Sequence, residues 1–79
     1  MNLIFLRSNG TIKNICKNPD EWSVPNLINQ FVQVLNPKYK IYYYRSWNQN
    51  GNIWYDIGSH TEFFILTNKT LNDGDLWTE

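Results

Sequence analysis

Cysteine is nearly absent from this sequence of 79 residues, and histidine occurs once. A single cysteine, Cys16, excludes an intramolecular disulfide and the cysteine-rich zinc patterns, and an unpaired thiol is typical of a reducing compartment. Long apolar runs are also missing, because the longest, 3–6 and 63–66, fall far short of the roughly 20 residues that a membrane-spanning helix needs. No basic segment followed by an apolar run opens the chain. We therefore predict a cytoplasmic protein without membrane association.

The sequence also lacks a net charge. Residues 1–45 contain six basic and two acidic side chains (+4), and residues 46–79 contain one basic and five acidic (−4). A duplex DNA-binding domain needs an excess of positive charge to neutralise phosphates, so this balance disfavours duplex DNA as a partner. No glycine-rich phosphate loop or dinucleotide fingerprint occurs. We predict no cofactor and no small-molecule substrate.

What the sequence does contain is thirteen aromatic residues and clear secondary-structure patterns. Two β-favouring runs around Asn9-Gly10 predict a hairpin over 3–16 with a two-residue type I′ turn. Its first strand is apolar on both faces, which predicts a strand inside a sheet or covered on both sides. A second hairpin, 39–48 and 52–58, is predicted around Asn50-Gly51, followed by a strand over 61–67.

A helix is predicted over 23–35, with Ser23 as its cap and Asn36-Pro37 as its end. Its apolar stripe recurs at spacings of three and four: Val24, Leu27, Ile28, Phe31, Val34 and Leu35. The other face is made of amides, which indicates either a low-charge solvent surface or a face that a partner covers: Asn26, Asn29, Gln30 and Gln33.

The order β-β-α-β-β-β predicts a single α+β domain over 1–79, with one antiparallel or mixed sheet and one amphipathic helix packed on one face. Residues 68–79 contain turn residues and acidic side chains. We expect them to form a loosely held tail, unless Leu76 and Trp77 dock on the sheet.

The second hairpin carries the candidate site. With Asn50 and Gly51 as the turn, Arg45 faces Asp56 and Trp47 faces Trp54. The alternate face is more apolar and matches the helix stripe: Tyr42, Tyr44, Ile53, Tyr55 and Ile57. The remaining face is predicted to look away from the helix and to bind a partner: Tyr43, Arg45, Trp47, Trp54 and Asp56.

Three interpretations of this aromatic face are open. The rings can be structural, with Trp77 folding over them, or they can form an interface with a protein partner or a second copy, since Trp, Tyr and Arg are enriched in binding hot spots. They can also stack single-stranded nucleic acid, helped by Lys38, Lys40 and Arg45, although Asp56 and Glu62 would repel phosphate. The leading hypothesis is a protein interface, with nucleic acid as the alternative.

The segment "DIGSHTE" holds residue types that catalyse hydrolysis. A nucleophile needs a base within hydrogen-bond reach, and adjacent Ser59 and His60 on an extended chain point apart. His60 and Glu62 share a face but supply only two metal ligands. Cys16 lies beside Ile15, which indicates burial of the thiol and not reactivity. We predict no catalytic residue, no metal site and no enzyme.

The segments "FLRSNG" and "YYYRSWNQNGNIWYDIGSHTEFF" resemble a group of small uncharacterised proteins encoded by phages and prophages of Gram-positive bacteria. The resemblance covers the two hairpins and the last strand, and is weaker in the helix. It implies a protein of the bacterial host cell's cytoplasm that binds a host or phage protein, and it implies no catalytic role for any residue.

Overall fold

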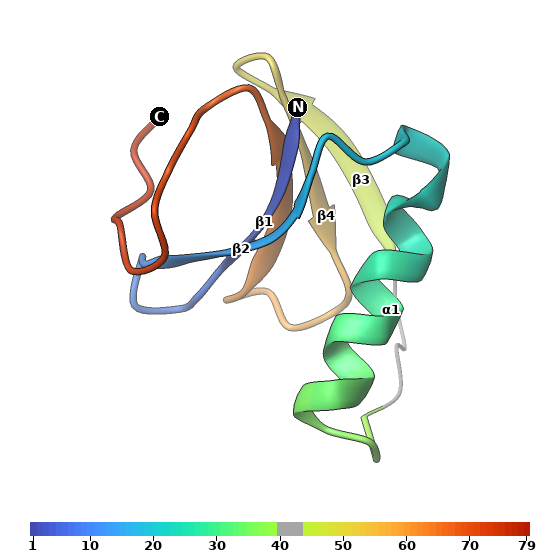
Figure 1. The fold of residues 1–79 in the computed structure, drawn as a ribbon. Helices are drawn as coiled ribbons and strands as arrows, with labels where there is room; N and C mark the ends of the chain where they lie inside the picture. Colours follow the sequence, from blue (N-terminus) through green and yellow to red (C-terminus); the bar gives the residue numbers. More distant parts are fainter. Residues whose placement is uncertain (40–43) are drawn as a thin grey trace.

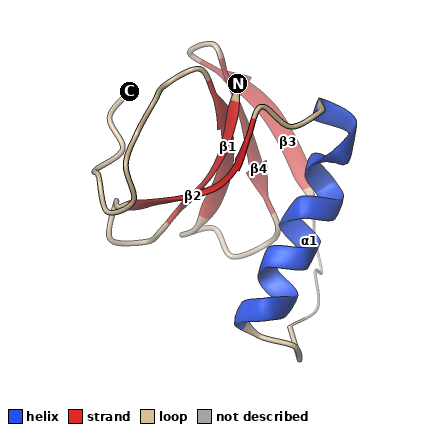
Figure 2. Cartoon of the chain, viewed as in Figure 1, coloured by secondary structure: helices blue, strands red, loops and turns tan. Residues whose placement is uncertain are grey.

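The computed structural model describes residues 1–39 and 44–79. The elements are β1 (Asn2–Leu6), β2 (Ile12–Lys17), a short 3-10 turn η1 (Glu21–Ser23), α1 (Val24–Leu35), β3 (Arg45–Gln49), β4 (Asn52–Asp56) and β5 (Phe63–Thr67). In the described residues, the strands form one antiparallel sheet in the order β2-β1-β5-β4-β3. Figures 1 and 2 show α1 on one side of this sheet. The predicted α+β fold, with a single sheet and one helix, is confirmed.

The two Asn-Gly pairs form different turns. Asn50 and Gly51 both have positive φ, at 52° and 80°, as the predicted type I′ turn requires. In the first hairpin only Gly10 has a positive φ, at 87°. The Arg7 N–H donates to the Thr11 oxygen at 2.9 Å, which closes a three-residue loop. The Asn9 side chain accepts the Thr11 N–H at 3.0 Å, which stabilises this wider loop. The prediction of a two-residue turn here was wrong.

The helix ends as predicted and begins differently. Asn36 is extended, with φ −150° and ψ 92°, before Pro37. Ser23 makes no capping bond, because η1 continues directly into α1 and the Ser23 hydroxyl donates to the Asp20 oxygen at 2.8 Å instead. Val34 and Leu35, predicted in the apolar stripe, are exposed, since the last turn of α1 extends past the sheet in Figure 1.

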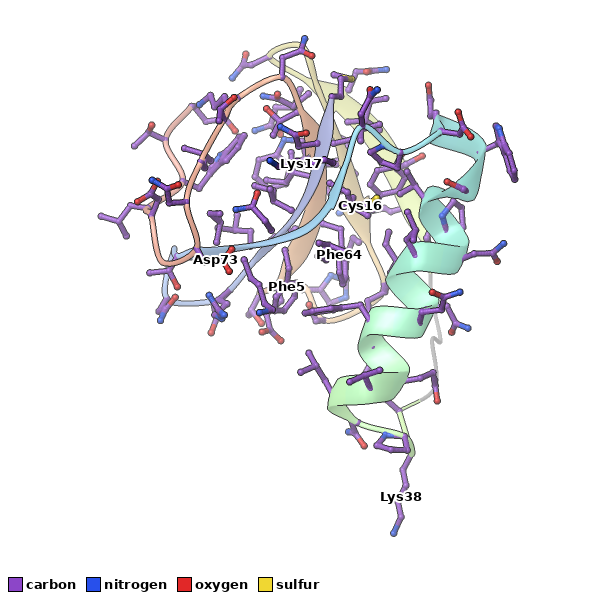
Figure 3. All side chains as sticks on the ribbon, in the orientation of Figure 1. Phe5, Cys16, Lys17, Lys38, Phe64 and Asp73 are labelled. Carbon is purple, nitrogen blue, oxygen red and sulfur yellow. The ribbon has the colours of Figure 1, made fainter. Side chains whose placement is uncertain are left out.

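The sheet has an apolar core on each face. The core beneath α1 contains Leu3, Phe5, Val24, Ile28, Val32, Tyr55, Ile57, Phe64 and Leu66. Figure 3 labels Phe5 and Phe64 within it, whose ring centroids are 5.0 Å apart. A smaller core on the opposite face contains Ile4, Ile12, Trp54 and Ile65. Because β1 contributes to both cores, the prediction that this strand is covered on two sides is confirmed.

Candidate functional site

The register of the second hairpin is the one that the sequence predicts. Arg45 pairs with Asp56 and Trp47 pairs with Trp54, and the two indoles stack with ring centroids 6.0 Å apart and an interplanar angle of 20°. Tyr55 and Ile57 are buried on the α1 face, while Trp47 and Trp54 belong to the core on the other face. The sidedness of the predicted site is therefore confirmed.

The expectation that this face is open is wrong for two of its residues. Trp54 is 8% exposed and Asp56 is 0% exposed, so neither offers a surface to a partner. Trp47 is partly buried and Arg45 is exposed. Tyr43, predicted on this face, and Tyr42, predicted on the core face, lie outside the described residues. The face is closed by residues 68–79, here named the C-terminal strap, which Figure 1 shows on the side of the sheet opposite α1.

Backbone hydrogen bonds tie the strap to β2. The Ile12 N–H donates to the Asp75 oxygen and the Gly74 N–H donates to the Ile12 oxygen, both at 2.9 Å. The carboxylate of Asp73, labelled in Figure 3, accepts the Asn14 N–H at 2.7 Å. This bond and a second from the Asn14 side chain lower the pKa of Asp73. The strap thus occupies part of the outer edge of β2.

Beyond β2 the strap crosses the aromatic face and reaches the tip of the second hairpin. The ring of Trp77 meets that of Trp54 edge-on at 5.9 Å, and Lys69 Nζ lies 4.3 Å from the Trp77 ring centroid. The Glu79 carboxylate accepts hydrogen bonds from Asn50 Nδ2 at 2.6 Å and from Gln49 Nε2 at 3.1 Å. Trp77 and Leu71 are therefore the strap residues that dock on this core, while Leu76 remains exposed.

Asp56 is a buried carboxylate that lies beside two exposed side chains, those of Arg45 and His60. Its Oδ1 accepts the Gly58 N–H at 2.8 Å, and its Oδ2 lies 3.2 Å from His60 Nδ1 and 3.7 Å from Arg45 Nε. The Arg45 guanidinium also lies 4.7 Å from the centre of the Trp47 ring, a cation–π contact. This cluster fixes the β4–β5 turn, where His60 adopts a left-handed φ of 62°.

The residue types of the "DIGSHTE" segment do not assemble as a triad. The Ser59 hydroxyl donates to the Glu62 backbone oxygen at 2.8 Å and accepts the Glu62 N–H at 2.9 Å, so it closes a turn. His60 is directed at Asp56. Within residues 1–39 and 44–79, no three side chains of His, Cys, Asp or Glu are grouped to hold a metal ion. Cys16 is partly buried against the core beneath α1.

The outer edge of β3 is a better candidate. In a two-residue hairpin, the residues that flank the turn exchange hydrogen bonds, and bonded pairs then alternate with unbonded ones along the strands. Arg45, Trp47 and Gln49 therefore direct their backbone groups at β4, whereas Ser46 and Asn48 direct theirs outward. No strand of the described chain pairs with this edge.

A shallow groove of about 480 Å³ borders this edge on the α1 side. Its lining comes from η1, the start of α1, and β3 with β4: Glu21, Trp22, Pro25, Tyr44, Ser46 and Tyr55. Trp22 is 79% exposed, a large value for an indole. Burial and the nearby Tyr55 raise the pKa of Tyr44 to about 12. Sequence reasoning assigned Tyr44 to the core, but its place beside the sheet edge leaves it partly exposed.

Trp22 is the functional candidate that sequence reasoning missed. It precedes the helical stripe and fits neither the period of three to four residues nor a strand alternation, so no pattern assigned it to a core. The one signal in the sequence was that Trp22 is an aromatic residue which belongs to neither the helical stripe nor any strand pattern.

No protein-family model matches the chain, and no curated protein and no solved structure matches it either. Among the described residues, no helix combines the length and the apolar character that crossing a membrane requires.

Proposed function

We propose that this chain is a small non-catalytic interaction module that binds a polypeptide strand along the outer edge of β3. The observation that carries the proposal is the difference between the two edges of the sheet. β2 bears Lys13 and Lys17, bulges at Ile15 and pairs with the strap. Charges, bulges and covering segments are the devices that keep sheet edges from pairing with other chains. β3 has one charged residue, Arg45, whose backbone groups are directed at β4. The residues that direct their backbone groups outward, Ser46 and Asn48, are uncharged, and in the described chain neither a bulge nor a paired segment protects them.

The chemistry of an open edge defines the kind of partner. Unpaired N–H and C=O groups accept an extended segment by adding a strand to the sheet, and main-chain hydrogen bonds then supply affinity. Alternate side chains of the added strand face the groove beside Trp22 and Tyr44, which would supply specificity. Trp and Tyr are residues that dominate binding energy at protein interfaces.

The same geometry supports a protein partner better than single-stranded nucleic acid. Base stacking needs accessible ring faces, and Trp54 is covered by Trp77. The tie between Ser59 and Glu62 likewise supports a non-catalytic role. In the setting that the sequence resemblance implies, the partner is a protein of the bacterial host or of the phage, and the two meet in the cytoplasm.

A displayed library of random peptides tests the proposal, with three forms of the protein as bait. Asn48→Pro removes an outward N–H without disturbing the bonds to β4, and Asn48→Ala is its matched control because it keeps that N–H. We expect peptides selected on the wild type to bind Asn48→Ala and to lose binding to Asn48→Pro.

Far-UV circular dichroism checks that each bait is folded. If Asn48→Pro does not fold, Asn48→Lys places a solvated charge at the same edge and replaces it. Peptides that bind all folded forms equally would show that binding occurs elsewhere on the molecule and would refute the proposed edge.

A further inference from the structure

We infer that the strand which occupies the edge of β3 is β3 of a second copy, so that two chains join in one continuous antiparallel sheet around a two-fold axis at Trp47. The inference rests on the proposed function, since it names the occupant of the same edge. It follows from the register and the side-chain contacts of β3 and from the opposite charges of Arg45 and Glu79, which a two-fold rotation brings together.

The register follows from parity and overlap. Two antiparallel strands form hydrogen bonds only between residues whose backbone groups point toward the partner, here Ser46 and Asn48. Full overlap of β3 with its copy places Ser46 opposite Asn48 of the second copy, and the reverse, with Trp47 opposite Trp47. Slipping the strands by two residues keeps the bonding pattern but leaves the strand ends unpaired, so full overlap is favoured.

The indoles gain contacts at the two-fold axis. Trp47 occupies a position that does not exchange hydrogen bonds with the second copy, and in such pairs the side chains approach most closely. It already stacks on Trp54 at 6.0 Å, so pairing would align four indoles in a row across the dimer once the Arg45 guanidinium, 4.7 Å from the Trp47 ring centre, turns toward the second copy. The partly exposed ring of Trp47 would thereby be covered.

Charges complement one another in this register. Arg45 lies opposite Gln49 of the second copy, and Gln49 Nε2 holds the Glu79 carboxylate at 3.1 Å. The guanidinium of each copy is thus brought near a carboxylate of the other, twice by symmetry, and no like charges of β3 are opposed. The zero net charge of the chain adds no repulsion between copies.

The groove on the α1 face receives a side chain of the second copy. Asn48 and Ser46 project on the same face as Tyr44, so Asn48 of the second copy is placed beside Ser46 at the mouth of the groove lined by Trp22 and Tyr44. The two-fold rotation places Asn48 of each copy at the groove of the other in the same way. One two-fold contact would therefore pair the outward backbone groups of β3, cover the mouth of the groove and bring opposite charges together.

Sedimentation velocity from about 1 μM to about 1 mM tests whether the copies associate. A five-residue strand is short, so we expect a monomer–dimer equilibrium that shifts with concentration. Asn48→Ala should dimerise like the wild type, and Asn48→Pro should stay monomeric, with Asn48→Lys as its substitute if it does not fold. Glu79→Arg should weaken association, because it opposes Arg45 with a like charge.

Disulfide trapping tests the register in a Cys16→Ser background. Ser46→Cys mixed with Asn48→Cys should give a cross-linked dimer under mild oxidation, whereas neither variant alone should cross-link rapidly. A chain that stays monomeric at every concentration, a dimer that persists in Asn48→Pro, or cross-linking by either single variant alone would overturn the inference. A monomer that still selects edge-binding peptides would leave the proposed function standing.

Discussion

Replacing Trp54 with alanine tests whether the face opposite α1 is a true second core. The Trp54 ring is 8% exposed and packs against Trp47 at 6.0 Å, Phe63 at 5.4 Å and Trp77 at 5.9 Å. Truncating a packed aromatic side chain costs about 3–5 kcal/mol. At roughly 0.05–0.15 kcal/mol per residue, the whole chain has a free energy of unfolding of about 4–12 kcal/mol. We therefore expect Trp54→Ala to lose about a quarter or more of the free energy of unfolding.

Urea denaturation followed by far-UV circular dichroism measures this loss. All proteins are compared at one low concentration, because self-association would make the midpoint depend on concentration. Trp22→Ala is the matched control, since the exposed ring of Trp22 should cost no more than about 0.5 kcal/mol. If Trp54→Ala and Trp22→Ala lower the free energy of unfolding by equally little, the strap does not form a core with the sheet. The face opposite α1 would then again be a candidate for partner binding.

Gly51→Ala should lower the free energy of unfolding, measured by urea denaturation, by about 1 kcal/mol. The φ of Gly51 is +80° and no atom lies within 4 Å of an added Cβ, so this loss reflects backbone strain and not a steric clash. Gly51→Asn should cost less, because Asn tolerates left-handed φ. Trp77→Ala should shift tryptophan emission to the red, since it uncovers Trp54. Acid should release the strap: hydrogen bonds from Asn14 and Asn50 lower the pKa values of Asp73 and Glu79 below 3.8 and 4.5, so their stabilisation is present above those values and is lost as pH falls through the lowered ones. Tryptophan emission across a pH titration reports this release, and a strap that leaves already near neutral pH would contradict it.

Local pattern and parity were enough to predict the hairpins, the helix and the sides of the sheet. A strand alternates its side chains strictly, so a fixed turn at Asn50-Gly51 assigns every residue of the hairpin to a face. The same dipeptide gave the wrong turn type at Asn9-Gly10, because the Asn9 side chain accepts hydrogen bonds from Thr11 and stabilises a three-residue loop. Turn type depends on such side-chain bonds, which a dipeptide pattern does not contain.

The strap was beyond the reach of local pattern. Residues 68–79 contain no alternation or helical period, and they are held by contacts with partners far away in sequence, such as Asn14 with Asp73 and Asn50 with Glu79. Only the tertiary structure brings those groups together. For this reason the candidate site differs from the predicted one. Trp77 covers Trp54, so the aromatic face is part of a core, and the accessible groups are those along the neighbouring outer edge of β3.

Closing both faces of the sheet has a consequence for stability as well as for binding. A chain of this length buries a thin core, and small domains often gain stability by adding a subunit. Here α1 covers one face, the strap covers the other face and part of the edge at β2, and in the described chain the outer row of backbone groups on β3 is left without a strand partner. A second copy on that edge would bury Trp47 and satisfy Ser46 and Asn48, so dimerisation and stability are linked by mass action. The thermal midpoint should therefore rise with protein concentration in the wild type and in Asn48→Ala, and stay constant in Asn48→Pro.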